Sequence, residues 1–226
     1  MNRLSLRPVL FMGIILILSA CSNSPPEILQ NFWEITLVES PDSTEELVTF
    51  REELSIFTVS RDDDGDDEIE SVFLIQDEEE LFWELDKDNW EEIELQGEKW
   101  IGGSSLLMME DEPFPRSSYR LLVIDRSGQR DETSIAISIK RVLDPLVFPR
   151  LSRNGDDWEI QSPYDQHIIR LYNGDSILKG QIKIDNKNFT QRFLREQLKP
   201  SSGDVLVLSA QDVSKGWVLQ SLPFQY

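Results

Sequence analysis

Short runs of aromatic and β-branched residues recur along this chain, and clusters of Pro, Gly, Asp, Asn and Ser separate them. Runs of this kind at intervals of about 8–12 residues are typical of β-sandwiches. The sequence therefore predicts an all-β protein. The expected strands cover residues 32–38, 54–59, 69–75, 81–85, 90–95, 100–101, 106–109, 119–125, 133–139, 158–161, 168–172, 177–184, 205–209 and 217–222.

Helical periodicity is confined to short segments. Phe189, Phe193, Leu194 and Leu198 fall at helical spacing, so a helix is expected within residues 188–198. Residues 43–53 are expected to form one or two helical turns.

Charge divides the chain into two unequal halves. Residues 22–142 carry 32 Asp and Glu against 10 Lys and Arg, a net charge of −22, whereas residues 143–226 carry 10 of each. A change of this size indicates a domain boundary. The acidic half also argues against nucleic acid and anionic phospholipid as ligands, because both are negatively charged.

The clearest predicted hairpin runs from Tyr119 to Ile139. Pro113 and Pro115 precede Tyr119, apolar residues lead to Asp125, and Gly128 marks the turn. This pattern resembles the last two strands of fibronectin type III-like and related immunoglobulin-like domains, without the Cys pair of antibody domains. The resemblance implies that the Tyr119 hydroxyl bonds to upstream backbone as a tyrosine corner.

These patterns predict two immunoglobulin-like β-sandwich domains. Leu143, Asp144 and Pro145 are interpreted as a linker between them. The first is the acidic domain, residues 28–142, and the second is a smaller β-rich domain, residues 143–226.

The N-terminus has the features of a secretory leader. Arg3 and Arg7 are followed by apolar residues from Val9 to Leu18, and Ser19 and Ala20 then precede Cys21, which is the only Cys of the chain. The apolar stretch is shorter than the roughly 20 residues that cross a bilayer. The segment resembles the lipobox signal peptide of bacterial lipoproteins.

The lipobox resemblance implies a location in the cell envelope. Residues 1–20 would be cleaved, Cys21 would be acylated, and residues 21–27 would form a short tether to the membrane. Ser22 follows Cys21, where that family usually carries Asp as its inner-membrane retention signal. The resemblance therefore favours the outer membrane where a cell has two. With Cys21 acylated, no thiol remains for a disulfide.

An acidic turn is the one candidate metal site. Asp62, Asp64 and Asp66 lie around Gly65, and dense carboxylates suit Ca²⁺. An EF-hand register through Gly65 would need an acidic residue at Ser60 and Glu at Ser71, so a solvated β-turn competes with weak Ca²⁺ binding. No other cofactor is expected.

The sequence predicts no catalytic site. Acidic residues flank aromatic ones at 78–83 and 90–92, but no carboxylate pair stands out as glycosidases require. His167 is the only His and is expected in a surface loop, which leaves zinc and nucleophile sites incomplete. Four Trp residues are expected to be core rather than ligand platforms: Trp33, Trp83, Trp90 and Trp100.

Three functions remain open at this stage. The favoured one is a non-enzymatic module that binds an envelope protein or acts as an envelope scaffold. The second is a solute- or glycan-binding lipoprotein that uses exposed Trp residues. The third, an envelope hydrolase, is the least supported by the sequence.

Overall fold

The computed structural model describes residues 24–226 except 45–46, 64, 66–67, 139–145 and 214. Its secondary structure is predominantly β-strand with one short α-helix, which confirms the all-β class. In chain order the elements are β1 (Glu27–Glu39), β2 (Phe50–Arg61), β3 (Ile69–Gln76), β4 (Leu81–Asp86), β5 (Glu91–Leu95), β6 (Glu98–Leu106), η2 (Met109–Asp111), β7 (Ser118–Asp125), β8 (Arg130–Ala136), β9 (Arg150–Asn154), β10 (Asp157–Gln161), β11 (Gln166–Tyr172), β12 (Leu178–Ile184), β13 (Asn188–Thr190), α2 (Gln191–Leu198), β14 (Val205–Asp212), β15 (Trp217–Gln220) and β16 (Phe224–Gln225).

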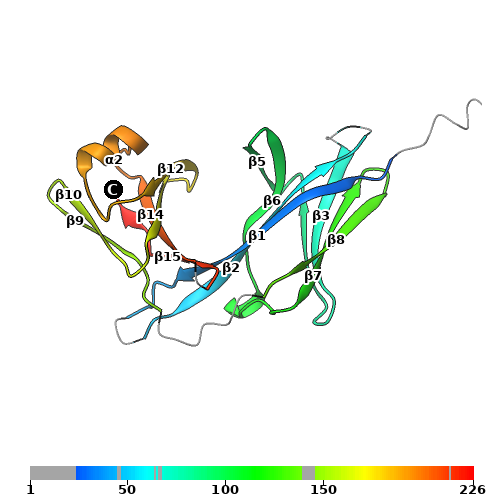
Figure 1. The fold of residues 1–226 in the computed structure, drawn as a ribbon, viewed down its shortest axis with the longest axis horizontal. Helices are drawn as coiled ribbons and strands as arrows, with labels where there is room; N and C mark the ends of the chain where they lie inside the picture. Colours follow the sequence, from blue (N-terminus) through cyan, green and yellow to red (C-terminus); the bar gives the residue numbers. More distant parts are fainter. Residues whose placement is uncertain (1–23, 45–46, 64, 66–67, 139–145, 214) are drawn as a thin grey trace, which may run out of the picture.

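Two lobes share one sheet (Figure 1). The shared sheet has nine strands in the order β12-β11-β14-β15-β1-β2-β6-β5, with β16 pairing β14. A four-stranded sheet, β4-β3-β7-β8, completes the first lobe, and a three-stranded sheet, β13-β10-β9, belongs to the second. The long strands β1 and β2 lie between the lobes.

The core of the first lobe follows from alternation along its strands. On β1, Ile35 and Leu37 are fully buried, and on β7 Leu121 and Val123 are fully buried. Successive side chains of a strand point to opposite faces. The apolar residues of the two sheets therefore meet between them, as in a sandwich.

A tyrosine corner closes this lobe. The Tyr119 hydroxyl donates to the Pro115 carbonyl oxygen at 2.9 Å, and Tyr119 is 1% exposed. Nearby, the Arg116 guanidinium pairs with the buried Glu52 carboxylate at 2.6 Å, and the Phe114 N–H donates to the same carboxylate. The predicted bond from Tyr119 to upstream backbone is confirmed.

The second lobe is built around Trp158. Its indole N–H donates to Gln191 Oε1 at 2.7 Å, and its ring contacts Phe189, Phe224 and Tyr226. Gln191 begins α2, whose preceding Thr190 accepts from the Phe193 N–H as an N-cap.

The lobes are joined by strand pairing and by an ion pair between a buried carboxylate and a half-exposed arginine. β1 and β15 run parallel, with Thr36 opposite Val218. Trp217 and Leu219 of β15 pack into the core of the first lobe. The fully buried carboxylate of Glu39 on β1 pairs with Arg150 on β9.

Several sequence expectations need correction. Residues 50–53 belong to strand β2, so the helical turns expected in 43–53 do not extend there. The helix expected within 188–198 begins only at Gln191, because residues 188–190 pair with β10. The strand expected at 106–109 is the end of β6 followed by η2. Among the described residues, no helix is long and apolar enough to cross a membrane.

Candidate functional site

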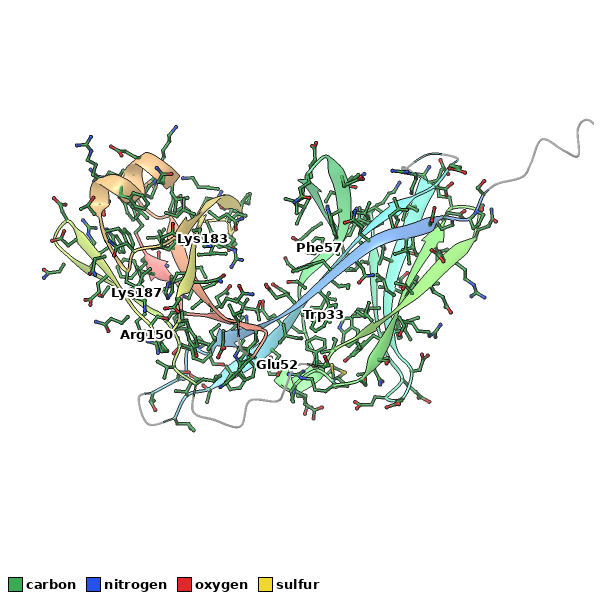
Figure 2. The ribbon with its side chains drawn as sticks, viewed as in Figure 1. Trp33, Glu52, Phe57, Arg150, Lys183 and Lys187 are labelled. Carbon is green, nitrogen blue, oxygen red and sulfur yellow. The ribbon has the colours of Figure 1, made fainter. Side chains whose placement is uncertain are left out.

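Within the residues that the structure describes, one face of the nine-stranded sheet has no second sheet packed on it where it passes between the lobes. This face is only partly exposed, since Phe57, Ser209 and Val218 on it are buried. On β1, Trp33 and Ile35 point toward the first-lobe core, so Phe32 and Glu34 point the opposite way. We call this side, which points away from the four-stranded sheet, the inner face. In Figure 2, Phe57 of the first lobe and Lys183 of the second are labelled on either side of the space between the lobes.

The first-lobe end of the inner face is apolar. The exposed fractions are 47% for Phe32, 44% for Ile93 and 54% for Leu95. With Phe57 and Trp100, these side chains line a pocket of about 240 Å³. Ile93 lies opposite Trp100, and Phe32 lies opposite Phe57, so the cluster is formed by cross-strand pairs on four adjacent strands.

Gly102 allows β6 to approach β2 closely under this cluster. A Cβ at this position would lie 2.0 Å from the Ile56 carbonyl oxygen. Gly102 pairs with Phe57, so the absence of a side chain keeps the floor of the apolar pocket in place.

The second-lobe end of the inner face is polar and carries two cations. Glu34 shares a pocket of about 150 Å³ with Arg170, Lys183 and Ser209. Arg170 donates to Ser209 Oγ at 2.8 Å. Burial raises the pKa of the Glu34 carboxyl above its ordinary value, and Arg170 partly opposes this shift.

A second pocket of about 390 Å³ lies on the other side of the β5–β6 hairpin. The half-buried Trp90 lines it, and its indole N–H donates to Glu92 at 3.3 Å. Glu92 also pairs with Lys99 at 3.0 Å. Arg61, Lys87 and Glu98 add three further charged groups to the wall. An aromatic ring among charged hydrogen-bonding groups is an arrangement that can hold a polar ligand.

The outer face of the four-stranded sheet carries another apolar surface. Phe82 on β4 is 66% exposed. It lines a shallow hollow of about 430 Å³ with Phe73, Ile75 and Leu122. Because this surface is also apolar and exposed, it serves as the comparison surface when binding to the inner face is tested.

The predicted metal and lipid sites fall mostly outside the described residues. Cys21, Asp64 and Asp66 are not described. Asp62 is buried directly after β2, and its carbonyl oxygen accepts from the Gly65 N–H as in a turn. In the described part of the chain, no three His, Cys, Asp or Glu residues are grouped to hold a metal ion.

His167 does not lie in a surface loop as expected. It is 1% exposed on β11, where it pairs with Ile184 and Ala210. Its Nε2 has no hydrogen-bond partner among the described residues. Burial lowers the pKa of this imidazole, Lys187 lowers it further, and Asp165 opposes the shift.

Three of the four Trp residues contact the core as expected, although Trp90 also lines the second pocket. Trp33, Trp83 and Trp90 pack against the first core. Trp100 instead lies on the inner face. The alternation Glu92, Ile93, Glu94, Leu95 signalled that the β5–β6 hairpin has an apolar side, and Trp100 lies opposite Ile93 on that side.

No family model and no curated protein sequence matches this chain.

Proposed function

We propose that this chain is a lipid-anchored protein of the bacterial cell envelope that binds a partner protein through the inner face and performs no chemistry itself. The observation that carries the proposal is the apolar cluster of Phe32, Phe57, Ile93, Leu95 and Trp100. Phe32, Ile93 and Leu95 of this cluster are exposed, and adjacent exposed apolar side chains mark interaction surfaces. The cluster lies beside Glu91, Glu92 and Glu94, which disfavours an anionic lipid surface as its partner.

The inner face runs across both lobes, which suits a partner as large as a protein. The apolar cluster and the pocket around Arg170 lie on the same face of one sheet. Phe32 of the cluster and Glu34 of the pocket are two residues apart on β1, and side chains at this spacing point to the same side of a strand. A partner seated there contacts both lobes.

The immunoglobulin-like assignment belongs to the same proposal. The tyrosine corner at Tyr119 and the two packed sheets of the first lobe support it. For the second lobe the support is its separate core around Trp158. The anchor rests on the lipobox ending at Cys21.

Site-specific photocrosslinking in intact cells tests the binding surface. A photoreactive residue at Ile93 is expected to capture one discrete protein, whereas the same residue at Phe82 is not. The purified partner should then bind the intact chain, and Leu95→Ala should weaken its binding about tenfold, because truncating a buried interface side chain costs more than about 1 kcal/mol. Capture at Phe82 alone would move the interface to the four-stranded sheet.

Fatty-acid labelling tests the anchor separately. The wild-type chain should incorporate labelled fatty acid, and Cys21→Ser should remain an unlabelled precursor. Equal labelling of both proteins would remove the anchor and the envelope location.

A glycan-binding function is favoured by one observation, the pocket beside Trp90. Ring stacking on Trp90 together with Glu98 and Lys99 is suited to a sugar. Titration with oligosaccharides would change the Trp fluorescence, and Trp90→Leu would abolish that change. No response in the wild-type chain would exclude this alternative for the sugars tried.

A further inference from the structure

Strand β5 is an open edge next to the apolar cluster. It ends the strand order of the nine-stranded sheet and pairs only with β6 among the described residues. All five of its residues, Glu91–Leu95, are exposed. An edge strand presents unpaired N–H and C=O groups to which an extended peptide can add.

The two sides of β5 have opposite chemical character. Ile93 and Leu95 point into the apolar pocket on the inner face. Glu92 and Glu94 point to the other side, since side chains alternate along a strand. Glu92 already pairs with Lys99, and Glu98 brings a further negative charge to the hairpin.

These charges determine which strand can add to the edge. A second β5 would place Glu beside Glu, and like charges directly opposite are destabilising. The chain as a whole has a net charge of −20, which adds to the repulsion between copies. A strand that carries Lys or Arg on this side gains cross-strand ion pairs instead.

We propose that the β5 edge accepts an extended segment of the partner protein in which apolar residues alternate with Lys or Arg. The segment extends the nine-stranded sheet by one strand. Its apolar side chains pack beside Ile93 and Leu95, and its cations lie beside Glu92 and Glu94. This inference rests on the proposed function, because it names the chemistry of the partner that the inner face binds.

A second copy of the chain is the competing occupant. Strand β12, at the opposite end of the same sheet, carries Lys179 and Lys183 and is itself a basic edge. Lys179 is already paired with Asp204, at 2.5 Å. The apolar side of β12 is already occupied, because Ile182 and Ile184 pack in the second core. Strand β12 of a second copy therefore cannot place these side chains beside Ile93 and Leu95, and we expect the protein to remain monomeric.

Peptide binding tests the inference directly. The intact chain in phosphatidylcholine nanodiscs is titrated with three labelled eight-residue peptides: alternating Lys and Val, alternating Glu and Val, and a peptide of four Lys followed by four Val. Only the alternating Lys and Val peptide should bind, and empty nanodiscs should not bind it. Hydrogen exchange of the β5 amides should slow when it binds.

Charge reversal provides the decisive variant. Glu92→Lys combined with Glu94→Lys should weaken binding of the basic alternating peptide about tenfold or more, because two attractive cross-strand charge pairs become repulsive. The same variant should now bind the alternating Glu and Val peptide. Glu70→Lys combined with Glu84→Lys makes the same change in net charge on exposed positions of the four-stranded sheet and should leave both affinities unchanged.

The inference would be overturned if the two double variants changed the affinity for the alternating Lys and Val peptide equally. It would also be overturned if the block peptide bound as tightly as the alternating one. If the intact chain forms oligomers and Lys183→Glu abolishes them, the β5 edge binds a second copy of the chain. That result would also overturn the inference. If the photoreactive residue at Ile93 captures a protein in cells but no alternating peptide binds, the inference fails and the proposed function stands. Should the basic peptide bind but no partner be captured at Ile93, the proposed function fails.

Discussion

The two lobes cover the same sheet in different ways. The first places a complete four-stranded sheet over it and fills the space with many aliphatic side chains. The second uses three short strands and α2, and its core centres on Trp158 with aromatic neighbours. A small unit buries a smaller share of its surface, so large aromatic side chains contribute more of its stability. The second lobe also depends on β1 of the first as the neighbour of β15.

Separating the lobes is the largest test of this comparison. A fragment of residues 27–142 is expected to melt cooperatively but at a lower temperature than the intact chain, because its core lacks Trp217 and Leu219. A fragment of residues 143–226 should lose its cooperative transition, because β15 loses its β1 partner and exposes Trp217. Calorimetry at low and high salt measures the melting transitions of the two fragments. Added salt should stabilise the acidic fragment more than the fragment of residues 143–226, because salt screens repulsion between like charges. If neither fragment melts cooperatively while the intact chain does, one cooperative unit spans both lobes.

Breaking the ion pair between the lobes should have the next largest effect. Arg150→Ala leaves the buried Glu39 carboxylate without its cation, and we expect a loss of about 2 kcal/mol in the free energy of unfolding, because Arg150 is half exposed and the Leu222 N–H still donates to this carboxylate. Arg192→Ala is the matched control, because its pair with Glu196 is exposed and worth about 0.5 kcal/mol or less. Chemical denaturation of the intact chain measures both, and equal losses would contradict a special role for Glu39.

The tyrosine corner distinguishes the first lobe on a smaller scale. Tyr119→Phe keeps the ring but removes the hydrogen bond to Pro115, and the expected loss is about 1 kcal/mol in unfolding free energy. Tyr172→Phe on β11 is the second-lobe comparison and should change this free energy less. A stability unchanged by Tyr119→Phe would show that the ring alone supports the bend.

His167 should make stability depend on pH. Its pKa is lowered in the folded chain, so the unfolded chain binds the proton more tightly. Well above a pH of about 6.5, the pKa of His167 in the unfolded chain, this histidine does not lower the free energy of unfolding. As the pH falls through that value toward the pKa of the folded chain, protonation of the unfolded chain lowers this free energy progressively. Denaturation between pH 7.5 and 5 should therefore show a smaller loss for His167→Gln than for the wild type. If the wild type and His167→Gln lose the same unfolding free energy between pH 7.5 and 5, His167 is not the cause of the pH dependence.

Calcium removal should have the smallest effect. A ligand that binds only the folded state stabilises it by an amount that grows with its concentration over Kd. For the weak site predicted around Asp62, Asp64 and Asp66, a chelator should leave the melting temperature unchanged within about one degree. A fall of many degrees would make the turn a structural metal site.

The sequence predicted strands well where one face of a strand is buried. Trp158 and Ile160, for example, alternate with exposed residues and form β10 as expected. It did not predict that β1 pairs with β15, because residues so far apart carry no local signal of their register. Hence a sheet that crosses the expected boundary near residue 143 emerged only from the structure.

The candidate site was harder to predict for a related reason. Ile93 and Trp100 have the same apolar pattern whether they face a core or solvent, and only the position of the second sheet decides between these cases. His167 was misplaced because a polar residue next to turn signals usually lies at the surface. His167 is buried on β11, which β12 and β14 flank on its two sides.

The length of β1 has a mechanical consequence. Any pull on the N-terminus enters the fold at Glu27 and runs along a strand that pairs with β2 over its whole length and with β15 near its end. Hydrogen bonds between strands are perpendicular to the strand axis, so this load shears many of them together rather than opening them one at a time. Tension applied at the N-terminus therefore reaches both lobes through β1.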